Sequence, residues 1–299
     1  MPALGWGMAT TAPPWSMAIT AMLVIQFSSA LSMSVIEQVG SGGTAWLRMC
    51  CGAVLLWLIV RPRLSSVSRG DVPALLTLGF ATGFMTMLFL FAIERIPLGT
   101  AVAVEFLGPL TVAAIASKSR SALAWPVLAL VGVVALTEPW HGEINLVGVG
   151  FALAAGACWG LYNVFTQHIG DCYSGISGLA LTIPIAAVFT APVGMPQVLG
   201  GNATWWVLLL AAGIALLSPV FSFGLEMGAL RRMNHTAFGT LLAVEPALAV
   251  LIGLIVLHQT PSAVQVIGIT LVVIAGAAAQ RGSSRGPAAS ADLAPPPPQ

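Results

Sequence analysis

Long apolar runs alternate with short charged or Pro/Gly-rich breaks along the whole chain, and this alternation restricts the fold more than any other feature. A helix needs roughly 20 apolar residues to cross a bilayer. The apolar runs cover residues 17–35, 44–60, 72–93, 98–117, 123–137, 146–167, 175–193, 203–228, 235–257 and 261–279. We therefore expect an all-α integral membrane protein with ten transmembrane helices.

Composition supports a membrane protein and excludes several other classes. Of 299 residues, 58% are hydrophobic and 7% charged, against roughly a quarter charged in soluble domains. The formal net charge of +1 provides no basic face, so we predict no nucleic-acid partner. The four cysteines form no C-x-x-C pair, so we predict neither a metal site nor a cofactor. The lipid bilayer is the expected surrounding.

The distribution of Lys and Arg predicts the orientation. Cytoplasmic loops are enriched in these residues, and the predicted topology places all of the eleven except Arg48 and Arg95 on one side. Both termini are then cytoplasmic, in a bacterial inner membrane. Residues 1–16 form a tail without Lys or Arg, so the first span is expected to remain as a membrane helix. The Pro/Ala/Ser-rich residues 281–299 are expected to be a disordered tail.

An internal repeat divides the chain into two halves, residues 17–138 and 139–280. A shift of about 137 residues overlays Phe84, Leu88, Ala92, Arg95 and Pro109 on Phe221, Leu225, Ala229, Arg232 and Pro246. Five spans per half is an odd number, so the second half enters the membrane from the opposite side, as in the inverted repeats of many secondary transporters. Because one chain contains both halves, we expect a monomer or a weak homodimer.

Two carboxylates lie within apolar spans, Glu105 near Pro109 and Glu245 beside Pro246. A charged residue inside a membrane is costly and usually faces a bundle interior or a watery cavity. Because burial penalises the charged form, such a group is suited to exchanging a proton for the ammonium group of a substrate. A structural alternative is that each carboxyl caps backbone groups freed where the proline interrupts its helix.

The sixth span carries Trp159, Tyr162, Asn163 and Thr166 on one helical face, a mixture of aromatic and hydrogen-bonding groups suited to a small zwitterion. Gln26 and Ser29 form a comparable face on the first span. Together with Glu105 and Glu245 they make up the predicted substrate and ion pathway. The alternative is that these polar groups bond across helices or to their own turn.

Other residues have more than one interpretation. Pro184 and Pro219, like Pro109 and Pro246, are predicted kinks that either permit bending or are passive. Arg48, near one end of its span, is expected to snorkel to headgroups or to attract a carboxylate. Glu226 is expected to pair with Arg231 or Arg232 near the membrane surface.

Two motifs indicate the family. They are Arg95 to Pro109, RIPLGTAVAVEFLGP, and Thr236 to Ala249, TAFGTLLAVEPALA. With ten spans in two halves, they resemble the EamA family of the drug/metabolite transporter superfamily, most of all its threonine/homoserine exporter branch. The resemblance implies export of a small polar metabolite, such as threonine or homoserine, which requires no catalysis, and the two buried carboxylates make protons the candidate coupling ion. The alternatives are broad efflux of amphipathic drugs and, from another class, a membrane enzyme or scaffold. The chain has no Walker A loop.

Overall fold

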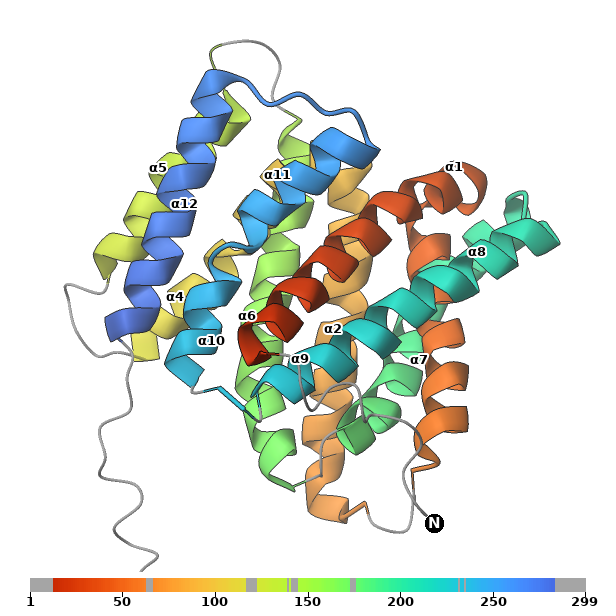
Figure 1. The fold of residues 1–299 in the computed structure, drawn as a ribbon. Coiled ribbons are helices and arrows are strands. Elements are labelled where there is room, and N and C mark those ends of the chain that lie inside the picture. The colour runs from red at the N-terminus through yellow and green to blue at the C-terminus, as the bar shows by residue number, and fades with distance from the viewer. Residues whose placement is uncertain are drawn as a thin grey trace, which may run out of the picture.

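The computed structural model describes residues 13–62, 67–116, 123–138, 140, 145–172, 176–230, 232–233 and 235–282. These residues form helices and turns, and no strand occurs among them (Figure 1). Within these ranges, seven helical stretches are long and apolar enough to cross a membrane, and two more apolar helices are shorter. The all-helical class is therefore confirmed for the described residues, whereas the number of spans expected from the sequence, ten, stays a prediction. Most of both predicted tails, residues 1–12 and 283–299, lies outside the described residues.

The helices lie on the predicted apolar runs, with several runs divided into two. In chain order they are α1 Pro14–Val60, α2 Val72–Ile93, α3 Leu98–Glu105, α4 Leu107–Ala116, α5 Ala124–Thr137, α6 Leu146–Cys172, α7 Ile176–Gly200, α8 Trp205–Ala215, α9 Ser222–Leu230, α10 His235–Leu242, α11 Glu245–Val256 and α12 Ala263–Gly282. A short 3-10 turn, Arg69–Asp71, precedes α2, and a π-helical segment, Leu216–Phe221, joins α8 to α9.

The first two predicted spans form a single element, α1, which bends at Gly40. The backbone there is non-helical, with φ of 73° and ψ of 166°, a conformation that glycine adopts without a Cβ clash. Just after the bend, the side-chain oxygen of Gln197 accepts a hydrogen bond from the Gly43 amide at 2.9 Å. The bend therefore joins two apolar helices, drawn red and orange in Figure 1.

Three of the four predicted proline kinks lie at or near helix breaks. Phe106 alone separates α3 from α4, three residues before Pro109, and Pro246 is the second residue of α11. Pro219 follows Ser218, whose backbone is extended. Pro184 differs, because α7 continues as a helix through it. Since proline lacks the backbone donor, a proline inside a helix, as Pro184 is in α7, leaves the carbonyl group four residues earlier free to accept another partner.

Helix packing pairs elements from the two halves of the chain. α2 packs on α6, and α5 packs on α12. The first half of α1 contacts α8, where Ser28 donates to the Ile214 carbonyl, and the second half contacts α7, where Trp57 donates to the Ala180 carbonyl at 2.7 Å. A Cβ at Gly132 on α5 would lie 2.6 Å from the carbonyl oxygen of Gly268 on α12, so this pair requires glycine.

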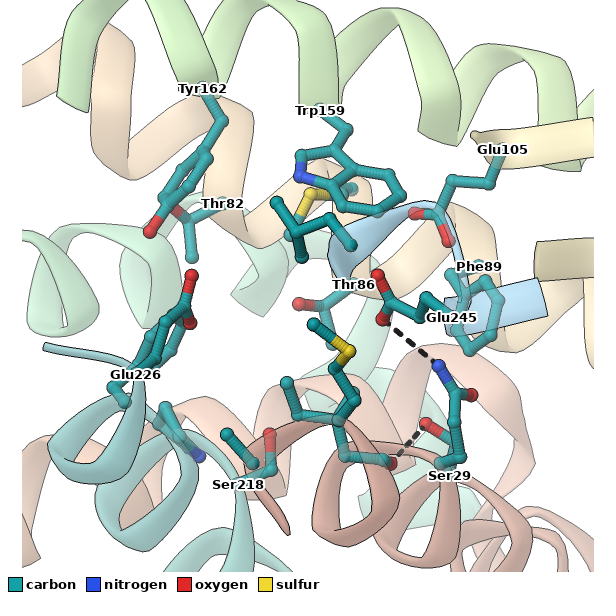
Figure 2. Close-up of a pocket in the computed structure, with 18 of the residues that line it drawn as sticks. Ser29, Thr82, Thr86, Phe89, Glu105, Trp159, Tyr162, Ser218, Glu226 and Glu245 are labelled. Carbon is teal, nitrogen blue, oxygen red and sulfur yellow. Dashed lines mark hydrogen bonds between the residues drawn. The ribbon is translucent and has the colours of Figure 1, made fainter. Parts of the chain in front are cut away.

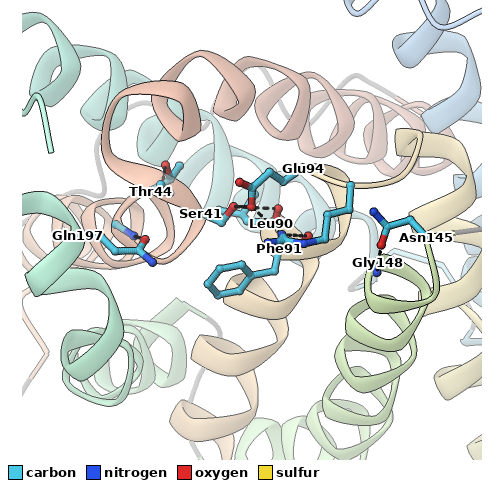
Figure 3. Close-up of polar contacts among 11 residues, drawn as sticks. Ser41, Thr44, Leu90, Phe91, Glu94, Asn145, Gly148 and Gln197 are labelled. Carbon is cyan, nitrogen blue, oxygen red and sulfur yellow. Dashed lines mark hydrogen bonds and ion pairs between the residues drawn. The ribbon is translucent and has the colours of Figure 1, made fainter.

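A polar cluster ties the bend of α1 to the end of α2 (Figure 3). The Ser41 hydroxyl donates to the Glu94 carboxylate at 2.6 Å, and Glu94 forms an ion pair with Arg95 at 2.7 Å. The Arg95 guanidinium also lies over the rings of Phe91 and Phe151. These contacts fix one end of the bundle around the start of α3.

Candidate functional site

The helix breaks bring Glu105 and Glu245 to a common cavity. Glu105 is the last residue of α3, and Glu245 is the first residue of α11. Their side chains come from opposite halves of the chain and face each other at one end of the cavity (Figure 2). Both residues are buried, with exposed fractions of 8% and 6%. Two carboxylates in such surroundings repel when both are ionised, so a cation or proton near them lowers the electrostatic cost.

The cavity has a volume of about 130 Å³ and lies inside the helix bundle. A single water needs only about 10–15 Å³ of such volume, so the space can accommodate several waters or a small metabolite. Its walls come from α1, α2, α3, α6, α7, α9, α10 and α11, together with the π-helical segment. Of the predicted pathway residues, the cavity is lined by Gln26, Ser29, Glu105, Trp159, Tyr162 and Glu245.

Glu245 is held by an amide from the first half of α1. Gln26 Nε2 donates to Glu245 Oε1 at 3.0 Å. The remaining oxygens of this pair, Gln26 Oε1 and Glu245 Oε2, are buried and have no hydrogen-bond partner among the described residues. Buried polar atoms in native proteins are almost always paired, so these two acceptors are suited to a bound donor. Ser29 donates to the Ile25 carbonyl of its own helix at 2.9 Å, which leaves its oxygen able to accept.

Aromatic and hydroxyl groups form the other walls. Trp159 packs edge to face against Phe106, the residue at the break between α3 and α4, with ring centroids 6.0 Å apart. Tyr162 lies at the end of the cavity opposite Glu105 and Glu245, near Thr82 and Glu226 (Figure 2). The structure thus places Trp159 and Tyr162 in the wall of the cavity. Asn163, next on the same helix, does not line it.

Arg48 lies in the wall of the cavity and not at the membrane surface. The snorkelling expectation is wrong, because Arg48 is 7% exposed and lines the cavity. Its Nε donates to the Ser218 carbonyl at 3.0 Å and its Nη2 to the Ser218 hydroxyl at 2.6 Å. Ser218 is the extended residue that interrupts the helix between α8 and α9. The available signal was an arginine inside the apolar run 44–60.

Glu226 also belongs to this cavity. The sequence predicts a pairing with Arg231 or Arg232, but the Glu226 side chain points into the cavity near Tyr162 (Figure 2). Arg232 instead contacts the sulfur of Met17, and Arg231 lies outside the described residues. Among the described residues, the wall of the cavity therefore contains three carboxyl groups, of Glu105, Glu226 and Glu245, and one guanidinium.

Comparison with known proteins gives a consistent result. Residues 146–278 match the model of the EamA-like transporter family. The threonine/homoserine exporters RhtA of Escherichia coli (strain K12) and of Salmonella typhimurium (strain LT2) are each 36% identical over 262 residues, which is 86% of this chain and 88% of theirs. The pseudopaline exporter CntI of Pseudomonas aeruginosa is 23% identical over 89% of this chain and 95% of its own.

The fold of this chain is similar to that of a solved structure. A crystal structure that is 19% identical superimposes with a TM-score of 0.60, covering 89% of this chain and 96% of its own. At this identity the likeness concerns the helix arrangement alone. It agrees with the all-helical bundle described above.

Proposed function

The chain belongs to the EamA-like transporter family of the drug/metabolite transporter superfamily, and we propose that it exports threonine, homoserine or a closely related amino acid. It is a membrane transporter and not an enzyme, as its relatives are named exporters. The observation that carries the proposal is the buried pair Glu105 and Glu245 in a central cavity. Two carboxylates beside unpartnered acceptors suit the ammonium group of an amino acid.

The proposed mechanism is alternating access between two inverted five-helix repeats. If α1 is counted as two spans, the helices give ten, in repeats of residues 17–138 and 139–280. The packing supports this assignment. In the proposed repeats, α2 corresponds to α8 and α9, and α6 corresponds to the first half of α1. The contact between α2 and α6 therefore has a counterpart in the contact of α8 and α9 with the first half of α1. The α5–α12 contact maps onto itself. Each repeat also has a broken fourth span, at Glu105 and at Glu245.

The positions of the residues around the cavity support entry of substrate from the cytoplasm. Its lining includes Ala18, Glu226 and Phe238, which lie near the predicted cytoplasmic ends of their helices. Beyond the glutamates, toward the predicted outer side, Leu90 and Leu98 belong to a closely packed buried cluster. Such an arrangement suits an exporter that loads from inside, with both termini cytoplasmic in a bacterial inner membrane. A monomer or weak homodimer is sufficient, since one chain supplies both repeats.

Proton antiport is the proposed coupling. A proton shared between Glu105 and Glu245 relieves their repulsion when no substrate is bound. The substrate ammonium relieves it when bound. Since the proton and the substrate ammonium group both neutralise the same pair of carboxylates, they compete for it. This competition exchanges a proton for a substrate molecule across the membrane.

A second candidate function is efflux of larger amphipathic compounds. The observation that favours it is the share of flexible or aromatic apolar groups in the cavity wall, including Met22, Met85, Phe89 and Phe223. Methionine-rich surfaces adapt to varied ligands. The buried charges argue for a charged polar substrate instead.

Counterflow in proteoliposomes tests the proposal. Vesicles are loaded with unlabelled threonine or homoserine, the labelled amino acid is added outside, and accumulation is compared with protein-free vesicles. We expect transient accumulation that excess homoserine suppresses. Exchange of a lipophilic cation without exchange of either amino acid would replace the proposal with drug efflux.

A further inference from the structure

Arg48 is a buried cation, and its hydrogen bonds to described residues go to Ser218 and to no carboxylate. Among the described residues, the ion pair within 4.0 Å joins Glu94 to Arg95 at the end of the bundle, and it does not involve Arg48. A buried charge is costly unless it is paired. Arg48 nevertheless lies in the wall of the cavity, with no described carboxylate bonded to it. Its charge therefore lacks a fixed counter-ion in the part of the chain that the structure describes.

The guanidinium is held in place by Ser218. The two hydrogen bonds to this residue use Nε and one N–H of Nη2. Arginine has five N–H donors, so three remain, and Nη1 forms no hydrogen bond with the described residues. Because Ser218 fixes the plane of the group from one side, the remaining donors form a fork of the geometry that a carboxylate accepts.

The charges of the cavity are separated along its length. Glu105 and Glu245 lie together at one end, whereas Ser218, which anchors Arg48, lies away from them on the wall below Trp159 (Figure 2). Glu226 lies beyond Ser218, toward the other end. A ligand with one positive and one negative group would meet groups of opposite charge at separate places.

We propose that Arg48 is the receptor for the carboxylate of the substrate, while Glu105 and Glu245 receive its ammonium group. This inference rests on the proposed function, and it defines the substrate class as α-amino acids with a free carboxylate. Amines and amino-acid amides are then rejected, because they leave the Arg48 charge buried and unpaired. Ser218 is the positioning residue that orients the guanidinium.

The test compares two competitors of labelled homoserine counterflow, L-threonine and L-threoninamide, at a pH where both amines are protonated. Threoninamide retains the ammonium and hydroxyl groups but lacks the carboxylate. In the wild type we expect threonine to compete about 10- to 100-fold better, the range for a charge-assisted bidentate contact. Equal competition would overturn the inference, whereas absence of any homoserine exchange would overturn the proposed function instead.

Variants then assign the preference to Arg48. R48Q is expected to reduce the threonine to threoninamide ratio to about one, and R48K, which keeps the charge without the fork, to an intermediate value. The matched control is R69Q, an exposed arginine away from the cavity, which should keep the wild-type ratio. Where R48Q does not transport, ligand-induced thermal stabilisation of detergent-purified protein gives the same ratio, and R48K serves if R48Q does not fold. A wild-type ratio in either Arg48 variant overturns the proposal.

Discussion

The two broken helices that carry Glu105 and Glu245, which the proposed repeat would align with each other, are held by different contacts. Glu105 ends α3, and its backbone lies directly against Gly156 of α6, where a Cβ would come 2.5 Å from the Glu105 carbonyl oxygen. Its side chain forms no hydrogen bond with the described residues. Glu245 begins α11 and accepts a hydrogen bond from Gln26. One break is held by backbone packing and the other by a side-chain contact.

This difference assigns unequal roles to the two carboxylates. A negative charge at a helix N-terminus is stabilised by the helix dipole, whereas one at a C-terminus is not. Glu245 has the favourable end of α11 and an amide donor, while Glu105 lies in the last turn of α3. We therefore expect Glu245 to be the fixed anchor for the ammonium group. Glu105 is then the carboxyl whose charge follows the bound ligand.

The largest predicted effect is that of Glu245→Gln. Removing the anchored charge should reduce homoserine counterflow about 100-fold, since a buried charge-assisted contact contributes about 1.5–3 kcal/mol and the substrate cation would be left facing a neutral amide. Initial rates in proteoliposomes measure the loss. Glu37→Gln is the matched control, because Glu37 is exposed on α1 and should retain wild-type exchange. Equal exchange in both variants would contradict the anchor role.

Glu105→Gln is predicted to have a smaller effect on exchange, about tenfold, and a specific effect on coupling. In the wild type, homoserine efflux should be faster when the outside is more acidic, because protons enter as substrate leaves. The glutamine cannot carry that proton, so the rate in E105Q should be the same with and without the pH gradient. Efflux against an imposed gradient measures this. A wild-type response to the gradient in E105Q would show that proton coupling does not depend on this carboxyl.

Some features of the fold and of the candidate site can be predicted from the sequence, and others cannot. The apolar runs predict the helices, because a backbone that crosses lipid must satisfy its own hydrogen bonds. A carboxylate inside a membrane is costly, so the sequence also draws attention to Glu105 and Glu245 as candidate functional residues. The repeat predicts that Asn163 is the counterpart of Gln26, at a shift of 137 residues. Gln26 reaches the cavity and Asn163 does not. A repeat in sequence fixes the corresponding helices, while the rotation of each helix depends on its own contacts.

The position of Arg48 is a second feature that the sequence does not predict. From the sequence, an arginine near one end of a span is best explained by snorkelling. Its true position depends on Ser218, which is 170 residues away and interrupts a different helix. An interaction of this kind has no local pattern in the chain. It becomes visible when both elements are placed in space.

Gln26→Leu tests the side-chain contact that holds the second break. Loss of the amide should raise the KM for homoserine about fivefold, because Glu245 loses a donor but keeps its charge. Asn163→Leu is the control that the repeat itself supplies, and it should leave KM unchanged. In a double-mutant cycle, Q26L should add little to E245Q, since both remove one interaction. Additive losses would mean that Gln26 acts independently of Glu245.

The smallest predicted effect on transport is that of Gly108→Ala, which tests the backbone packing at the first break. A Cβ at Gly108 would overlap the carbonyl oxygen of Gly156, so α4 must move away from α6. Such overpacking costs about 1–3 kcal/mol and should lower the melting temperature of the purified protein. Gly150→Ala on α6 is the control, because a Cβ there meets nothing within 4 Å. If the Glu105 break depends on this packing, G108A should also weaken the response to a pH gradient while homoserine affinity, which depends on Glu245, is retained. Loss of affinity without loss of the gradient response would reverse the roles assigned to the two carboxylates.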